Sequence, residues 1–492
     1  MNRRLFSALF FLTALAFTPA VRADAPAPWP VPTSGTDWYR ISLLGQPAGY
    51  MSSTSRLVQD DQGAECLQEA DRQVINFSVT GQTLKITEDV VTLYARDLSP
   101  LRWDVRLDKM GQIQEVTAHR QGKTIQISST EAGRTTDQTL TLPDNFAGDL
   151  GMEADILKGA LQPGDTRTVT TFIPEVGALD TETVTVGQPE TLTVVGQPER
   201  CTPLVVTAAK VGSEIHLWLN ADGEIVKLAM PTLLGAVAEK VSQAEALRQF
   251  APLVLADSLA LDKTLPQTTG LKRLVLNARG LGQAAADLVP ATPRQTVVPG
   301  PDNTARVTVI SQAPPAQTVP LPVTAPDMQD YLKSTPIAQS DDPKLQALAH
   351  QIVGGETDSY RAALKLSRWV YQNLGKMESD PRPITALQVL AQGKGDCSDH
   401  ALLTATLGRV VGLPTRMVTG LAAIGDHMYY HAWVEVYVGT WVEIDPTWNE
   451  TGVDAGHLAL GRSALDEVSF ARMSLDTGRT LGALTLSVVE WQ

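Results

Sequence analysis

Cys397 lies in a short glycine-bounded stretch, GKGDCSDHA, at residues 393–401. Leu403, Leu407 and Val410 follow at helical spacing, which predicts that Cys397 occupies the first turn of a buried helix. The positive end of a helix dipole and its N–H groups favour a thiolate over a thiol. The same N–H groups, with that of Cys397 itself, can receive a developing oxyanion. This pattern predicts a nucleophilic cysteine.

Two strand-like stretches downstream carry the partners that such a cysteine needs. Residues 431–438 alternate between two faces, with His431 on the more polar face, and residues 441–447 alternate in the same way and carry Asp445. A cysteine nucleophile requires a base within hydrogen-bond reach, and that base requires an orienting carboxylate. Cys397, His431 and Asp445 supply all three groups.

The turn between these two strands decides whether His431 and Asp445 face the same way. Side chains alternate along a strand, so a strict two-residue turn at Gly439 and Thr440 would place them on opposite faces. We therefore expect an odd number of loop residues or a bulge between the strands.

Residues 385–449 resemble the bacterial transglutaminase-like superfamily. The matching blocks stand in the family's order: GKGDCSDHA at 393–401, GLPTRMVTG at 412–420, HAWVEV at 431–436, and Trp441 followed by DPT at 445–447. The resemblance extends from near residue 330 to the C-terminus. It implies a papain-like fold in which Cys397 is the nucleophile, His431 the general base and acid, and Asp445 the orienting carboxylate.

Other residues near these blocks have weaker assignments. Trp433, Glu435 and Trp448 are candidate substrate-binding residues, and a surface aromatic face explains them equally well. His400 is expected to cap or pack, and His457 is assigned a structural role ahead of a substrate-side one. No zinc-type spacing, phosphate loop or dinucleotide fingerprint stands out, so no metal and no cofactor is predicted.

The pattern along the chain predicts an α+β protein. Strand-like runs separated by turn residues predict one antiparallel β-rich domain over residues 37–250. Residues 255–325 are predicted to form a small β module with a proline-rich linker, because proline removes a ladder donor. Helical spacing then begins, and residues 326–492 comprise the expected transglutaminase-like catalytic domain. The β-rich region is similar to the N-terminal extensions of some secreted members of the family.

The first residues have the three-part layout of a secretory signal peptide. A basic start at Arg3 and Arg4 precedes an apolar run over residues 5–17 and a small-x-small site that ends at Ala23. We expect cleavage near Ala23, a flexible lead-in over residues 24–36, and a periplasmic or secreted protein. An anchor that is never cleaved is the alternative. No later segment is apolar enough to span a bilayer, so no integral membrane span is expected after the signal (residues 1–23) is removed.

The chain has three cysteines, which in an oxidising compartment predicts one pair and one remaining thiol. Cys66 and Cys201 lie in strand-like sequence far from Cys397 and are the predicted disulfide. Two buried thiols are the alternative.

The composition narrows the classes of function. The formal net charge is −14, which argues against a nucleic-acid partner, because such proteins need a basic surface to meet phosphates.

The predicted function is a secreted or periplasmic cysteine-dependent acyl-transfer enzyme that acts on amide bonds through a thioester on Cys397. A protein or peptide substrate is expected, with peptide or amide hydrolysis ahead of cross-linking. The alternative is a non-catalytic binding or scaffold protein that retains the fold and binds through its β-rich region. A redox thiol is a weaker idea, because no C-x-x-C motif is present.

Overall fold

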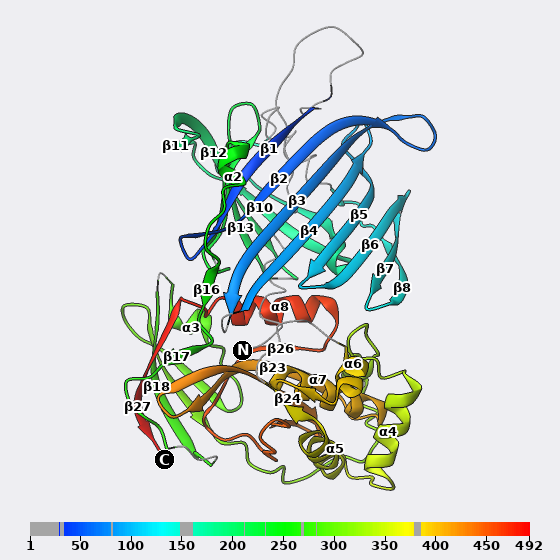
Figure 1. Cartoon of the computed structure of the whole chain (residues 1–492), viewed down its shortest axis with the longest axis vertical. Helices are drawn as coiled ribbons and strands as arrows, with labels where there is room; N and C mark the ends of the chain where they lie inside the picture. The colour runs from blue at the N-terminus through cyan, green and yellow to red at the C-terminus, as the bar shows by residue number, and fades with distance from the viewer. Residues whose placement is uncertain are drawn as a thin grey trace. The chain divides into compact units, whose positions relative to one another are not determined.

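The computed structural model describes residue 29 and residues 34–79, 82–147, 161–210, 212–231, 233–266, 270–281, 283–377 and 385–492. The predicted signal peptide, 1–23, lies outside these residues, as does most of the lead-in. The described chain forms two compact units, one ending at Val254 and the other comprising Leu255–Gln492 (Figure 1). Among the described residues, no helix combines the length and the apolar character needed to cross a membrane.

The N-terminal unit is built on one antiparallel sheet. Its strands follow the order β8-β7-β6-β5-β4-β3-β2-β1-β15-β14-β13-β12-β10-β9, and β11 pairs with β12. The bounds are β1 (Ser34–Leu43), β2 (Gln46–Gln59), β3 (Glu65–Val79), β4 (Gln82–Tyr94), β5 (Pro100–Lys109), β6 (Gln112–Gln121), β7 (Thr124–Glu131), β8 (Arg134–Thr141), β9 (Thr166–Ile173), β10 (Ala178–Val186), β11 (Glu190–Val194), β12 (Gln197–Ala208), β13 (Glu214–Leu219), β14 (Ile225–Met230) and β15 (Ala236–Val241), with η2 (Pro174–Val176), α2 (Gln243–Ala246) and β16 (Leu253–Leu255) beside them.

Local sequence explains this meander. Alternate residues of β1, among them Tyr39, Ile41 and Leu43, are buried while their neighbours are more exposed, as expected for a strand with one covered face. Leu44 and Gly45 both have positive φ, which suits the tight hairpin that joins β1 to β2. Gly122 likewise has a positive φ, of 59°, in the turn between the paired strands β6 and β7.

The C-terminal unit combines helices with three sheets, which confirms the α+β class. The first sheet has the order β17-β24-β23-β26, with β25 paired to β24; the second has the order β19-β20-β18-β27; and β21 pairs with β22 in parallel. The strands are β17 (Ser258–Ala260), β18 (Arg273–Gly280), β19 (Gln295–Pro299), β20 (Thr304–Ile310), β21 (Gly375–Lys376), β22 (Lys394–Gly395), β23 (Thr415–Ile424), β24 (His427–Tyr437), β25 (Trp441–Ile444), β26 (His457–Ser463) and β27 (Leu484–Trp491). The helices are α3 (Ala285–Leu288), η3 (Pro326–Leu332), α4 (Pro343–Val353), α5 (Ser359–Asn373), α6 (Ala386–Gln392), α7 (Cys397–Val410) and α8 (Glu467–Gly478).

Helix α7 is the centre of this unit. It packs against α4, α5 and α6 and against strands β23 and β24. Every residue from Ser398 to Arg409 is buried, so the helix is covered on all sides and not only along the predicted stripe.

The last strand of the chain joins the segment predicted as a separate small module. Strand β27 pairs antiparallel with β18, so residues on either side of position 326 share one sheet. Residues 255–325 and 326–492 accordingly lie within a single compact unit. A functional boundary at 326 stays a prediction.

Candidate active site

The hairpin of β24 and β25 brings His431 and Asp445 to the same face. Tyr437 pairs with Trp441, and three residues, 438–440, join the two strands. The predicted odd-numbered loop is therefore confirmed, and alternation along both strands turns His431 toward Asp445.

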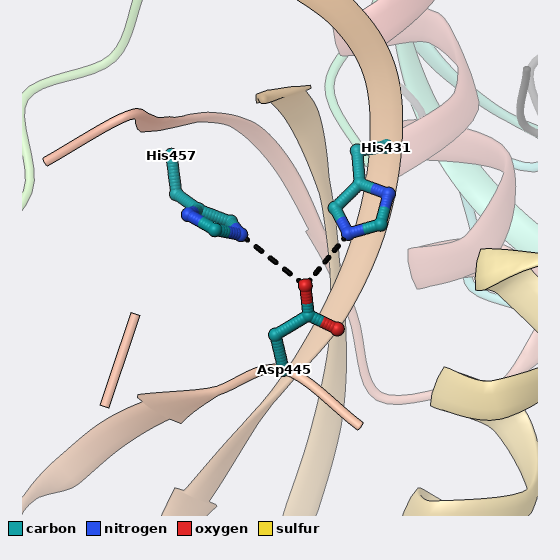
Figure 2. Close-up of side chains that lie close together, drawn as sticks. All are labelled: His431, Asp445 and His457. Atoms are coloured by element: carbon teal, nitrogen blue, oxygen red, sulfur yellow. Dashed lines mark hydrogen bonds and ion pairs between the residues drawn. The ribbon is translucent and has the colours of Figure 1, made fainter. Parts of the chain in front are cut away.

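Asp445 is the common acceptor at this site. The Nε2 of His431 donates to Oδ2 of Asp445 across 2.8 Å, and the backbone N–H of Thr447 donates to Oδ1 across 2.6 Å. A second imidazole, that of His457, lies 3.3 Å from the same Oδ2 through its Nε2 (Figure 2). Asp445 is fully buried, and burial alone would raise its pKa. The His431 and His457 imidazoles outweigh burial and hold the pKa of this carboxyl well below its usual range.

His431 is the residue that links the carboxylate to the cysteine. Its Nε2 donates to Asp445, and its ring also interacts electrostatically with Cys397. Burial alone would lower the pKa of His431, but the charges of Asp445 and Cys397 and the hydrogen bond to Asp445 raise it to about 10. The structure therefore brings together the three residues predicted as the triad.

The local sequence fixes the start of helix α7 at Cys397. Asp396 is the N-cap, and its Oδ1 accepts from the backbone N–H groups of Ser398 (2.9 Å) and Asp399 (3.3 Å). Asp399 completes a capping box by accepting from the backbone N–H of Asp396 at 3.1 Å. Two of the N–H groups predicted to receive an oxyanion are thus occupied by the cap, which does not use the N–H of Cys397.

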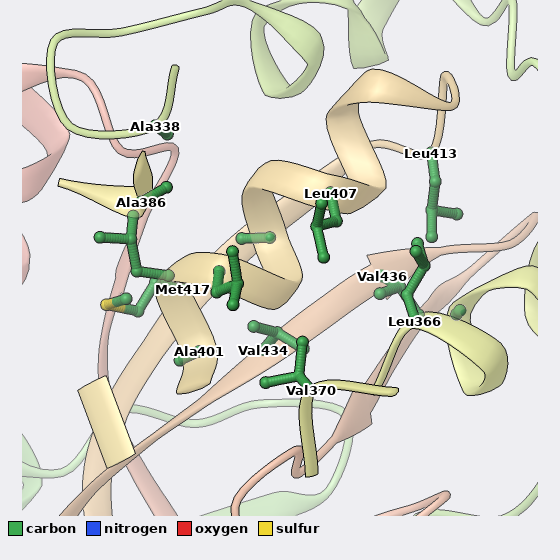
Figure 3. Close-up of a cluster of buried hydrophobic side chains, with 14 of the residues drawn as sticks. Ala338, Leu366, Val370, Ala386, Ala401, Leu407, Leu413, Met417, Val434 and Val436 are labelled. Carbon is green, nitrogen blue, oxygen red and sulfur yellow. The ribbon is translucent and has the colours of Figure 1, made fainter. Parts of the chain in front are cut away.

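A packed apolar core holds this helix in place. Ala401 and Leu407 of α7 lie in one cluster with Val434 of β24 and with Leu366 and Val370 of α5 (Figure 3). Cys397 itself is half-buried and packs against the edge of the cluster. The thiol therefore sits at a rigid helix start with partial access to solvent.

Two of the three residues predicted to bind substrate, Trp433 and Glu435, are buried. Trp433 is completely buried, and its Nε1 donates to Oε2 of Glu443 at 2.8 Å. Glu435 is 3% exposed and forms ion pairs with Arg416 and Arg462. Their face of β24 is polar in sequence but is covered in the fold, so neither side chain is available to a substrate.

Trp448 is the third, and it does lie at the site. Its ring stacks on the His431 imidazole, with centroids 4.5 Å apart and an interplanar angle of 15°. Asp445 and Glu450 exchange both backbone hydrogen bonds, and the turn between them carries the half-buried Trp448. An aromatic face against an imidazolium is favourable, so Trp448 supports the charged form of His431. A contact between Trp448 and substrate stays a prediction.

Residues that precede the sequence blocks also support the site. Nη2 of Arg294 donates to Oε2 of Glu443 at 2.7 Å and to the backbone oxygen of His457 at 3.2 Å. Arg294 and Glu443 are both buried, and although burial works against ionisation of Glu443, Arg294 lowers its pKa. The segment predicted as a separate β module therefore anchors strand β25 and the start of β26.

The disulfide predicted between Cys66 and Cys201 is wrong, since both are free buried cysteines. Cys66 lies on β3 and Cys201 on β12, and β2, β1, β15, β14 and β13 intervene in the sheet order. A disulfide needs Cα atoms within about 7 Å of each other. Neighbouring strands offer that distance, but β3 and β12 are not neighbours. Burial raises the pKa of both thiols, which makes them poor nucleophiles.

Two groups of side chains in this region have donor types that can hold a metal ion. The first group is His431, Asp445 and His457, and the second is Glu450, Asp454 and His457. Each residue offers one ligand atom, and within each group these atoms lie within 4.8 Å of one another. Both ring nitrogens of His457, and Nε2 of His431, already face carboxylate oxygens at hydrogen-bonding distances. Hydrogen bonding between the side chains accounts for both groups.

His457 is the residue at this site whose role sequence reasoning missed. The sequence favours a structural role for His457, and its neighbours in sequence show no motif that points to Asp445. Its position depends on the pairing of β26 with β23, in which His457 lies opposite Ala422. Only the order of strands in the sheet brings the second imidazole to the carboxylate.

Comparison with known protein families finds a match within the C-terminal unit. The family model of the transglutaminase-like superfamily matches residues 346–446. An uncharacterized protein of Mycobacterium leprae (strain TN) is 28% identical over 110 residues, or 20% of this chain. The chain spans 39% of the length of that relative.

Solved structures resemble parts of the chain at low identity. A "Putative Cysteine Protease" from Cytophaga hutchinsonii aligns with 46% of this chain and 90% of its own, at 17% identity and a TM-score of 0.32. A β-barrel-like protein of a domain of unknown function from Brucella abortus aligns with 42% of this chain and 95% of its own, at 11% identity and a TM-score of 0.32. Cys397, His431 and Asp445 all fall inside the family match at 346–446, and the C-terminal unit of this chain carries a domain of the transglutaminase-like superfamily.

Proposed function

We propose that this chain is a cysteine-dependent acyl-transfer enzyme that acts on amide bonds through a thioester on Cys397. The observation that carries the proposal is the side chain of His431, which donates to Asp445 and interacts with Cys397. In this geometry the ring nitrogen that Asp445 leaves unoccupied, Nδ1, is the one that exchanges a proton with the thiol.

The first half of the reaction forms the thioester. The Cys397 thiolate attacks the carbonyl carbon of the amide, and the carbonyl oxygen takes up the negative charge. The N–H of Cys397 lies at the positive end of α7 and is suited to that oxyanion. When the C–N bond breaks, the His431 imidazolium gives its proton to the departing amine.

The second half releases the acyl group. A water molecule attacks the thioester while His431 removes its proton, and the Cys397 thiolate leaves. An amine in place of water would give transamidation. We place hydrolysis of a peptide or amide first, because water needs no acceptor site of its own.

We also propose that the protein is periplasmic or secreted. The layout of residues 1–23 supports this proposal, and N-terminal sequencing of the protein from its native host tests it. A mature chain that begins near residue 24 is expected, whereas an intact Met1 would contradict cleavage.

Labelling of the full chain with iodoacetamide at neutral pH, followed by peptide mass spectrometry, tests the nucleophile. Cys397 is expected to react first, and Cys397→Ala should lose this fast labelling. Cys66→Ser is the matched control, because Cys66 is a buried thiol whose pKa is raised by burial. Release of amine from a peptide library should likewise require Cys397. A wild-type chain that releases no amine would support the scaffold alternative.

A further inference from the structure

The carboxylate of Asp445 serves two imidazoles, and the proposed mechanism uses only one of them. We infer that His457 is a positioning residue, which holds Asp445 ionised and turned toward His431. This inference rests on the proposed function, because it assigns a role in the same site.

His457 contacts carboxylates through both of its ring nitrogens. Its Nε2 lies 3.3 Å from Oδ2 of Asp445, and its Nδ1 lies 3.2 Å from Oδ1 of Asp454 and 3.9 Å from Oε2 of Glu450. The side chain is completely buried. Both nitrogens can donate only in the imidazolium form. Three nearby carboxylates favour that form.

Three aromatic rings also lie beside the His457 ring. Trp433 and Trp448 meet its ring nearly edge to face, at centroid distances of 5.1 and 5.3 Å, and the His431 ring lies at 5.8 Å. Burial alone would lower the pKa of His457, but its hydrogen bonds to Asp445 and Asp454 raise it. The raised pKa of His457 agrees with its contacts to these carboxylates.

The backbone around His457 is fixed independently of Asp445. Asp454 accepts at Oδ1 from the N–H of Gly456 at 2.8 Å and at Oδ2 from the N–H of Gly270 at 2.9 Å. Arg294 donates to the backbone oxygen of His457. His457 therefore stands on a rigid frame from which it can fix the orientation of Asp445.

Loss of His457 would remove one of three donors to a buried carboxylate. Asp445 would retain His431 and the N–H of Thr447, but its ionised form would be less stable. Asp445 would then take up a proton at a higher pH, and a protonated Asp445 no longer holds His431 in place as a base. The expected consequence is a change in pH dependence and not only in rate.

The test compares His457→Gln with His457→Leu in the full chain. A glutamine amide can place an N–H near the position of Nε2, whereas leucine fills space without a donor. The readout is the rate of Cys397 alkylation by iodoacetamide against pH. The matched control is His427→Gln on β24, whose partner is the exposed Asp426.

For His457→Leu we expect the acid limb of the alkylation profile to move up by about 1 pH unit, with a loss of about 10-fold at its lower end. His457→Gln should restore the wild-type limb, and His427→Gln should not move it. A loss of equal size at every pH, without rescue by glutamine, would indicate a merely structural residue and overturn the inference.

A second measurement needs no substitution, in case His457→Leu does not fold. In the wild-type chain labelled with ¹⁵N-histidine, both nitrogens of His457 should be protonated at neutral pH. A His457 whose Nε2 carries no proton overturns the inference. Alkylation requires no amide substrate, so a wild-type chain with the expected profile but without amide hydrolysis would count against the proposed function alone.

Discussion

Arg294 and Glu443 form a buried ion pair, with 2.7 Å between Nη2 and Oε2 and about 5% exposure of each side chain. Glu443 stands on β25, two residues before Asp445, and Trp433 donates to the same carboxylate. Arg294 lies outside the segment matched by the family model, at 346–446. The site is thus supported by a residue that a minimal definition of the domain would leave out.

Replacement of this arginine should destabilise the C-terminal unit strongly. Arg294→Met leaves the Glu443 charge buried without its main partner, which typically costs about 3–5 kcal/mol. Urea unfolding of the full chain measures the change, and hydrogen exchange of β25 and β26 shows whether it is located there.

Arg306→Met is the matched control for this substitution. Arg306 is 54% exposed and pairs with Glu490 at 3.9 Å, so its loss should change the free energy of unfolding by only about 0–1 kcal/mol. Equal effects of the two substitutions would contradict the importance of the buried pair.

The start of helix α7 should tolerate no side chain at Gly395. A Cβ at this position would lie 2.4 Å from Cβ of Asp399, which forms the capping box at the start of α7 together with Asp396. Gly395→Ala must displace the cap and with it the thiol, and we expect amide hydrolysis to fall by about 10- to 100-fold. Steady-state kinetics with a peptide amide measure the loss.

Gly355→Ala provides the comparison, because a Cβ there would meet nothing within 4 Å. Its activity should equal that of the wild type. If Gly395→Ala were also fully active, the capping box would not position Cys397.

Much of the triad could be predicted because it depends on local pattern. The alternation of residues 431–438 and 441–447, together with an odd loop, was enough to place His431 and Asp445 on one face. The glycines and the apolar spacing around Cys397 were enough to place it at a helix start.

One limit of the sequence-based prediction is that it does not show which face of a strand is covered in the fold. Trp433 and Glu435 lie on a polar face that alternation marks as exposed, but Glu443, Arg462 and Arg294 bury it in paired charges. Periodicity reports polarity, and paired charges can be buried.

The order of strands in the sheets is a second limit of that prediction. The contact of His457 with Asp445 and the separation of Cys66 from Cys201 both follow from that order. Spacing within a short window carries no information about either.

Trp448 should govern the charge of His431. Trp448→Ala removes the ring that stacks on the imidazole, so the imidazolium loses a cation–π contact and the pKa of His431 should fall. A cation–π contact of this kind contributes about 0.5–2 kcal/mol. Its removal should therefore slow Cys397 alkylation below neutral pH by about 2- to 30-fold.

Trp448→Phe keeps an aromatic face and should retain most of that rate. Direct titration of His431 by NMR in both variants provides the measurement. An unchanged pKa in Trp448→Ala would show that the stacking has no electrostatic role.

The stability of the C-terminal unit should depend on pH through the ion pair of His431 and Asp445. The pKa of His431 is raised from 6.5 to about 10 in the folded chain, so its contribution is complete below about pH 6.5 and is lost as the pH rises through 10. The pKa of Asp445 is lowered instead, so its contribution is complete above the ordinary aspartate range and is lost as the pH falls below that range. The two together predict a stability plateau between about pH 5 and 7.

Asp445→Asn tests the alkaline side of this plateau. Without the carboxylate, His431 loses the largest contribution that raises its pKa, so the variant should be less stable than the wild type near neutral pH. The difference in the free energy of unfolding between the two chains should shrink as the pH is raised from 7 toward 10, because the wild type then loses the ion pair that the variant never had. Urea unfolding at several pH values gives this difference directly, and a difference that stays constant over the range would show that His431 is neutral in the folded protein.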